Sequence, residues 1–304
     1  MVVPMPHVLV EPDVLAADPE ARADDLHRAL VDPDIRGIIS TIGGDDSIRI
    51  LPFLDLDLLA TNPKVFLGYS DSTATHMAFL RAGVGSFYGP AVMTGFAENG
   101  GMHAYTEDGV RAVLMAPGTP GPWPENADGW TKGFLDWADP TNQDRRRALL
   151  PSTGWRWLGG ESSEGPIVAA CLESLDWLRG TRWWPDLEGA VLAVETSEEQ
   201  PAPAIVARSL HSLAATGDLA RLRGILFGRP GGSDLDPADH VLYDDAIVSV
   251  VREEQGLLAL PIVTGMDFGH TDPVWTIPQG IPTRIDTEAR TIRFLESGVS
   301  SAEA

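Results

Sequence analysis

The chain has 304 residues, which suffices for two domains or one large domain. Its apolar fraction of 43% and charged fraction of 22% are typical of a globular protein and exclude a disordered or fibrous chain. The formal net charge of −22 argues against nucleic acid and anionic membranes as partners, because both need a positive surface, and it leaves a small-molecule substrate open.

The single cysteine, Cys171, excludes an internal disulfide and a zinc site built from thiolates. The N-terminus has no basic region followed by an apolar region, so we predict no signal peptide. No apolar run approaches the length that spans a membrane. We therefore expect a protein of the reducing cytoplasm.

Short apolar runs alternate with amphipathic segments along the first 116 residues. The predicted strands are residues 7–11, 35–44 and 64–70. The predicted helices are residues 19–31 with Asp18 as N-cap, residues 47–60 with a bend near Pro52, and residues 73–83 ending at Gly83. Strands that alternate with helices in this way predict a parallel sheet with helices on its faces.

Residues 117–165 are rich in proline, glycine and tryptophan and show little periodicity, which is typical of a linker or loop. They separate a predicted N-terminal domain, residues 1–116, from a predicted C-terminal domain, residues 166–304. In the second domain the predicted helices are residues 168–180, 202–215 and 238–255, and the predicted strands are residues 189–195, 223–228 and 261–267. Residues 282–296 predict a hairpin that turns at Thr287 to Ala289.

The pentapeptide Gly68-Tyr69-Ser70-Asp71-Ser72 lies between a predicted strand and a predicted helix. It is similar to the G-x-S-x-G nucleophile elbow, with Ser72 in place of the last glycine. A serine in such a turn projects from the backbone beside the helix N-terminus, whose partial positive charge favours an oxyanion. The alternative is that Ser70 or Asp71 only caps the helix.

A serine nucleophile needs a base and an acid that orients the base. His270 follows a predicted strand directly and lies in a loop, a common place for catalytic residues, although a structural loop histidine is the alternative. Glu195 ends another apolar strand, either as a strand-end cap or as the orienting acid, while Glu198 and Glu199 are expected to be solvated. The remaining histidines that lie in helical patterns are predicted to be ordinary helix residues: His27, His76 and His211.

Paired glycines, Gly43 and Gly44, follow the strand of residues 35–44. They form either a plain turn or, together with the Asp71 N–H, an oxyanion hole. Trp130 and Trp137 in the irregular stretch are either packing anchors or a stacking platform for a flat ligand. Three aspartates resemble a cation loop but lack its glycine and distal glutamate, so helix capping is favoured: Asp234, Asp236 and Asp239.

Four separated motifs together resemble one family. They are Ser40-Thr41-Ile42-Gly43-Gly44, Gly68-Tyr69-Ser70-Asp71, Leu192-Ala193-Val194-Glu195 and Gly269-His270-Thr271-Asp272-Pro273. In this order they resemble the serine LD-carboxypeptidases, and the segment FYGPA at residues 87–91 and the tryptophan pair resemble the branch of microcin C immunity proteins. The resemblance extends from about residue 20 to about residue 297.

The resemblance implies an α/β fold, with a flavodoxin-like parallel-sheet N-terminal domain, a C-terminal domain built on a β-barrel-like sheet, and the site between them. It implies that Ser70 attacks an amide carbonyl, that His270 transfers the proton, and that Glu195 orients His270. The backbone N–H groups of Gly44 and Asp71 would hold the oxyanion. The resemblance implies a homodimer, and no metal or cofactor is expected.

In the immunity branch the substrate is an aminoacyl or peptidyl nucleotide. The resemblance then places Trp137, and after it Trp130, on the base, and Gly43 at the substrate. Two alternatives are an LD-carboxypeptidase that releases D-alanine from a murein tetrapeptide and a non-catalytic homologue that only binds nucleotides.

The chain departs from the family pattern in two places. Family members usually carry a further strand and helix ahead of the strand predicted at residues 7–11, and their absence predicts a gap in the first sheet. The family also shows a glycine pair followed by Asn and Leu where this chain has Ala169-Ala170-Cys171-Leu172. If that asparagine contacts substrate, the specificity of this chain differs.

Overall fold

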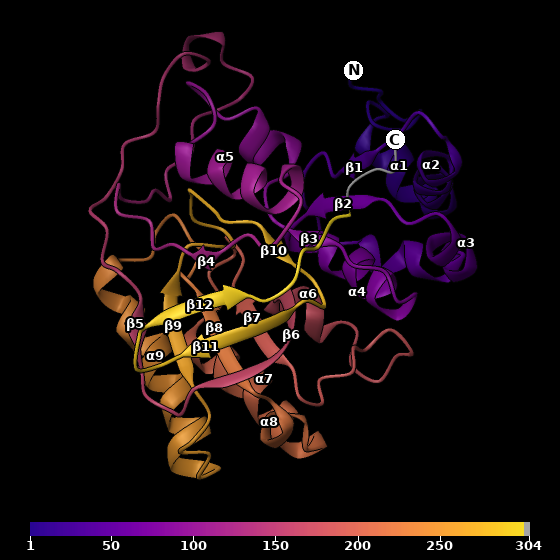
Figure 1. The fold of residues 1–304 in the computed structure, drawn as a ribbon. Coiled ribbons are helices and arrows are strands. Elements are labelled where there is room, and N and C mark those ends of the chain that lie inside the picture. The colour runs from indigo at the N-terminus through magenta and orange to yellow at the C-terminus, as the bar shows by residue number, and fades with distance from the viewer. Residues whose placement is uncertain (301–304) are drawn as a thin grey trace.

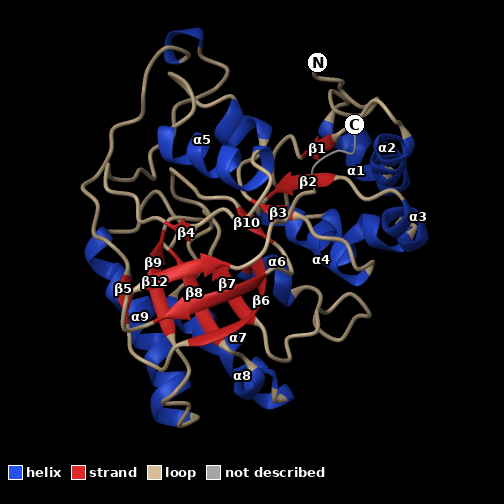
Figure 2. Ribbon diagram, viewed as in Figure 1, coloured by secondary structure: helices blue, strands red, loops and turns tan. Residues whose placement is uncertain are grey.

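The computed structural model describes residues 1–300 and contains two sheets, each with helices beside it (Figures 1 and 2). The strand order is β1-β2-β3-β10 in the first sheet and β4-β12-β11-β6-β7-β8-β9-β5 in the second. The N-terminal part builds the first sheet, to which β10, Ile277–Pro278, returns from near the C-terminus. The α/β class predicted from the sequence is confirmed. Among residues 1–300, no helix combines the length and apolar character needed to cross a membrane.

The first sheet is parallel in its first three strands and antiparallel where β10 joins β3. Its strands are short: β1 Gly37–Ile39, β2 Val65–Gly68 and β3 Phe87–Tyr88. The helices of this part are α1 Pro12–Ala17, α2 Pro19–Val31, α3 Leu56–Thr61, α4 Thr73–Arg81 and α5 Ala104–Val110. Asp18 caps α2 as predicted, because its carboxylate accepts a hydrogen bond of 3.0 Å from the Ala21 N–H.

Two predictions in this part are wrong. Residues 7–11 do not form a strand; they turn, and the His7 backbone and ring each lie 2.9 Å from Asp25 of α2. No described strand pairs with the outer edge of β1, and a cavity of about 480 Å³ lies between this turn and β1. Residues 47–60 form a 3₁₀ turn and then α3 rather than one helix, because Pro52 lacks an N–H and Asp55 caps a new helix.

The second sheet has four central parallel strands: β6 Ser163–Cys171, β7 Val191–Glu195, β8 Gly224–Gly228 and β9 Ile262–Met266. The hairpin β11 Pro282–Asp286 and β12 Thr291–Phe294 continues it as predicted. Two short strands from the irregular stretch complete its edges: β4 Pro122–Trp123 and β5 Arg156–Trp157.

The helix predicted at residues 168–180 is wrong in its first part, because β6 occupies those residues and only the short α6, Leu172–Asp176, follows. The run from Ile167 to Cys171 is almost continuously apolar and is buried on both faces of the sheet. Such a run has no periodicity that distinguishes a buried parallel strand from a buried helix.

The core has two main parts, one on each face of the second sheet. Leu192 and Val194 of β7 pack with apolar side chains of the covering helices on one face of the sheet. Val191 and Ala193 pack with a second apolar cluster on the opposite face. This alternation follows from the two-residue repeat of a strand. The covering helices are α7 Pro203–Thr216, α8 Asp218–Arg221 and α9 His240–Val248.

Candidate active site

Ser70 lies on a strained turn between β2 and α4. Its φ of +60° falls in the left-handed region that residues other than glycine rarely adopt. A side chain on Gly43 would place its Cβ 2.8 Å from the Ser70 hydroxyl, so only glycine lets this backbone approach so closely. The turn therefore projects Ser70 toward the carboxyl ends of strands in the second sheet.

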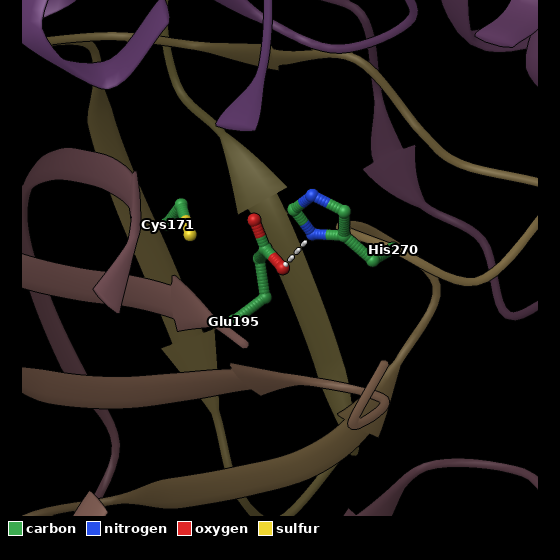
Figure 3. Close-up of side chains that lie close together, drawn as sticks. All are labelled: Cys171, Glu195 and His270. Carbon is green, nitrogen blue, oxygen red and sulfur yellow. Dashed lines mark hydrogen bonds and ion pairs between the residues drawn. The ribbon is translucent and has the colours of Figure 1, made fainter. Parts of the chain in front are cut away.

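The structure brings Ser70, His270 and Glu195 into one hydrogen-bonded chain. His270 Nε2 lies 3.0 Å from the Ser70 Oγ, and His270 Nδ1 lies 2.7 Å from Glu195 Oε2 (Figure 3 shows the second contact). Glu195 is fully buried at the end of β7, and His270 follows β9. A hydroxyl, an imidazole and a carboxylate in series form the arrangement that activates a serine as a nucleophile.

Tyr88 of β3 joins the two ends of this chain and was not predicted. Its hydroxyl accepts a hydrogen bond of 3.1 Å from the Ser70 N–H and donates one of 2.5 Å to Glu195 Oε1. Burial, together with the charge of Glu195, holds the pKa of Tyr88 well above its usual range, so the hydroxyl keeps its proton. The resemblance covers residues 87–91, but nothing local to this tyrosine indicates its contacts.

Three glycines allow Glu195 and His270 to pack side by side. A Cβ on Gly269 would lie 2.5 Å from Glu195 Cγ, and one on Gly228 would lie 2.6 Å from Glu195 Cβ. A Cβ on Gly231 would come within 2.8 Å of His270 Cβ. Larger residues at these positions would displace one of the two side chains.

The His270 imidazole lies among carboxylates. Burial alone would lower the pKa of His270, but the charge and hydrogen bond of Glu195, with the charges of Glu198 and Glu173, raise it to about 9. The ring of Tyr69 covers the imidazole at 5.0 Å between centroids. The surrounding carboxylates therefore favour the protonated imidazole.

The carboxylates near His270 and Tyr69 differ in their partners. Glu173 accepts hydrogen bonds of 2.9 Å from the Ser197 N–H and 2.6 Å from its hydroxyl. Asp272 lies 2.7 Å from the Arg147 guanidinium. The Glu198 side chain is 73% exposed, as predicted for a solvated residue, yet its Oε2 lies 3.1 Å from His270 Nε2.

Gly43 and Gly44 lie directly beside the Ser70 turn. A Cβ on Gly44 would lie 3.1 Å from the Asp71 carboxylate. That carboxylate accepts hydrogen bonds from the N–H and the hydroxyl of Ser47, at 2.9 Å and 2.7 Å, and so fastens the glycine segment to the turn. The two backbone segments that the sequence suggested for an oxyanion hole are thus adjacent.

The two tryptophans of the irregular stretch have different environments. Trp130 is only 1% exposed, with its ring beneath the Arg229 guanidinium at 4.8 Å and against the His240 ring at 5.4 Å. This burial favours the packing alternative for Trp130. Trp137 is partly exposed and makes an edge contact with Phe134 at 5.2 Å.

Cys171 lies beside the triad at the end of β6. Figure 3 shows the Glu195 carboxylate between Cys171 and His270, and ligand atoms of the three residues lie within 4.8 Å of one another. Burial and the charge of Glu195 raise the pKa of the thiol well above its usual range. Asp236 accepts a hydrogen bond of 2.9 Å from the Ala238 N–H, so it caps a turn as the capping alternative predicted.

Comparison with known proteins agrees with the predicted resemblance. Residues 2–89 match the LD-carboxypeptidase N-terminal domain, and residues 164–285 match the LD-carboxypeptidase C-terminal domain. The microcin C7 self-immunity protein MccF of Escherichia coli is 28% identical over 282 residues, which cover 92% of this chain and 79% of that protein.

Solved structures share the fold of more than nine-tenths of the chain. A MccF-like protein from Streptococcus pneumoniae, in complex with AMP, has a TM-score of 0.83 at 30% identity, covering 95% of this chain and 87% of that one. MccF in complex with aspartyl sulfamoyl adenosine has a TM-score of 0.79 at 26% identity, covering 93% and 82%. Since the two family models together match most of its residues, the chain belongs to the LD-carboxypeptidase family of hydrolases.

Proposed function

We propose that this hydrolase uses Ser70, His270 and Glu195 to cleave the amide between an aminoacyl or peptidyl group and a nucleotide-like group. The observation that carries the proposal is the chain of hydrogen bonds from the Ser70 hydroxyl through the imidazole to the buried carboxylate. Ser70 Oγ attacks the amide carbonyl while neutral His270 takes the hydroxyl proton through Nε2. Glu195 holds the ring in place and stabilises the imidazolium that forms.

The imidazolium then returns its proton to the leaving nitrogen, the carbon–nitrogen bond breaks, and an ester to Ser70 remains. Water, deprotonated by His270, hydrolyses that ester and restores the hydroxyl. The N–H groups of Gly44 and Asp71 stabilise the negative oxygen of each tetrahedral intermediate. This role is supported by their position beside the strained Ser70 turn.

The relatives support the nucleotide part of the substrate, because MccF was solved with aspartyl sulfamoyl adenosine and the MccF-like protein with AMP. We infer that the substrate lies between residues 1–116 and 166–304, beneath the loop of residues 117–165. The partly exposed Trp137 would stack on the base, since Trp130 is buried against Arg229.

Hydrolysis of aspartyl sulfamoyl adenosine by the wild-type protein and its Ser70→Ala variant tests the proposal. We expect Ser70→Ala to lower kcat by about 10³-fold or more, because the nucleophile is removed. Ser249→Ala, a serine at the far end of α9, is the control and should retain the wild-type rate.

Other results would replace the proposal. Release of D-alanine from a murein tetrapeptide without cleavage of the nucleotide would assign the cell-wall substrate. Nucleotide binding without turnover of either compound would identify a non-catalytic homologue.

A further inference from the structure

Glu198 is the carboxylate beside His270 that has no structural role. Glu195, Glu173 and Asp272 each accept hydrogen bonds from other side chains. Within residues 1–300, the Glu198 carboxylate contacts His270, with its Oε2 3.1 Å from the imidazole Nε2. Its side chain is 73% exposed, so the carboxylate can leave the ring at little cost in packing.

The position of this carboxylate conflicts with catalysis in the resting site. His270 Nε2 has to accept the Ser70 proton, and Ser70 Oγ lies 3.0 Å from it. A negative oxygen 3.1 Å from the same nitrogen favours a proton on it and so disfavours the neutral imidazole. A positive group that binds the carboxylate away from Nε2 therefore favours the neutral imidazole that catalysis uses.

We propose that Glu198 binds the free α-ammonium group of an aminoacyl substrate and thereby releases His270 to act as the base. This inference rests on the proposed function and narrows its substrate class. The α-nitrogen is separated by one carbon from the carbonyl that Ser70 attacks, so it reaches the site within a few ångströms of Ser70 Oγ. An ammonium–carboxylate pair is a charge-assisted hydrogen bond.

A peptidyl substrate lacks this positive charge, because its α-nitrogen belongs to an amide. When a peptidyl substrate binds, Glu198 stays beside the imidazole, and a smaller fraction of His270 is neutral and able to act as the base. The chain therefore prefers aminoacyl nucleotides with a free amine over peptidyl nucleotides.

The test compares aspartyl sulfamoyl adenosine with N-acetyl-aspartyl sulfamoyl adenosine, which differ only at the α-nitrogen. For the wild-type protein we expect kcat/KM to favour the free amine by about 10-fold or more, the ratio that a hydrogen bond to a charged group supplies. Glu198→Gln should reduce that ratio to about 3-fold or less, mainly by raising KM for the free amine. Glu199→Gln, the neighbouring exposed glutamate, is the matched control and should keep the wild-type ratio.

A second readout needs no substrate. The carboxylates that act on the His270 ring are Glu195 from β7, Glu198 from the loop after it and Glu173 from α6, and the ring of Tyr69, which Asp272 influences, covers the imidazole. Removal of one negative charge destabilises the imidazolium, so an NMR titration should find a lower pKa for His270 in Glu198→Gln than in Glu199→Gln.

The outcomes separate the two proposals. Two results would overturn this inference while the proposed function stands. The wild-type protein could turn over both compounds without preferring the free amine, or Glu198→Gln could keep the wild-type ratio of kcat/KM between them. Absence of turnover of both sulfamoyl adenosines by the wild-type protein would overturn the proposed function, and this inference with it.

Discussion

At the scale of single residues, Tyr88 links the two ends of the candidate triad. Its hydroxyl accepts from the Ser70 N–H and donates to Glu195, so one atom fixes both the strained turn and the orienting carboxylate. Because the hydroxyl keeps its proton, it remains a donor to Glu195 throughout the neutral range. The buried carboxylate thus has a hydrogen bond on each oxygen.

Tyr88→Phe tests this link. The substitution keeps the ring but leaves the Ser70 N–H and one Glu195 oxygen without a partner, which costs about 1–3 kcal/mol for each buried group. We expect kcat/KM to fall by about 10-fold or more and the melting temperature to fall as well. Tyr105→Phe also loses a buried hydroxyl contact, to the Pro124 carbonyl, but lies outside the triad and should lower stability alone. Equal kcat/KM for both variants would contradict the link.

The grouping of Ser70, Glu195 and His270 was predictable from sequence because each lies at or shortly after the end of a strand, and because their motifs together resemble one family. Ser70 follows β2 in an elbow, Glu195 is the last residue of β7, and His270 follows β9 between turn residues. Tyr88 is also the last residue of a strand, β3, but no pattern around it indicates its contacts, and the contact of Glu198 depends on the path of an exposed loop. Their roles come from tertiary contacts, which leave no local signal in the chain.

At the scale of elements, the turns after β8 and β9 are built from glycines that the triad needs. Gly269 has a φ of +99°, and its missing side chain leaves room for Glu195. Gly256 has a φ of +67°, but nothing lies within 4 Å of where its Cβ would be. A side chain at Gly256 would therefore introduce backbone strain alone, whereas one at Gly269 would introduce backbone strain and crowd Glu195.

Gly269→Ala and Gly256→Ala form a matched pair. Both introduce a side chain at positive φ, which costs about 1–2 kcal/mol. Gly269→Ala also forces Glu195 or His270 to move, so we expect it to lower kcat by about 100-fold or more, as misplaced catalytic groups do. Gly256→Ala should be destabilised in urea while kcat stays at the wild-type value. A wild-type kcat for Gly269→Ala would show that the site tolerates the shift.

Elements with amphipathic periodicity or clear caps were predicted well, and isolated apolar runs were not. Helix α2 was found from its cap and periodicity, and the hairpin of β11 and β12 from its alternation and turn. Residues 7–11 and β6 are both short apolar runs, yet one turns and the other is the buried strand beside β7. What decides between them is the presence of a neighbouring strand, which is a property of the assembled sheet.

At the scale of the whole molecule, the site is assembled by parts that are far apart in sequence. Ser70 comes from the first sheet, and Glu195 and His270 come from the second. The irregular stretch connects to the His270 loop, because Thr131 and Asp272 exchange backbone hydrogen bonds of 2.7 Å and 3.0 Å. The position of His270 relative to Ser70 therefore depends on contacts that join both sheets and the irregular stretch.

Arg147 is the side chain that ties these parts together. Its guanidinium binds Glu98 at 2.8 Å and 2.5 Å, Asp272 at 2.7 Å and the Gly133 carbonyl at 3.0 Å. The side chains of Arg147 and Glu98 are 12% and 5% exposed, so the pair is largely removed from water. Loss of the guanidinium would leave two carboxylates close together without a compensating charge.

Arg147→Gln should therefore lower the free energy of unfolding by about 3–5 kcal/mol, the usual effect of breaking a buried ion pair from one side. Urea unfolding checks the value, with the exposed Arg146→Gln as a control expected to change it by about 0.5 kcal/mol or less. We further expect proteases to cut Arg147→Gln faster within residues 117–165, because that stretch loses its attachment to the His270 loop. Equal unfolding energies and cleavage rates in the two variants would mean that the other contacts of the irregular stretch, among them the backbone pairing at Thr131, hold it in place without Arg147.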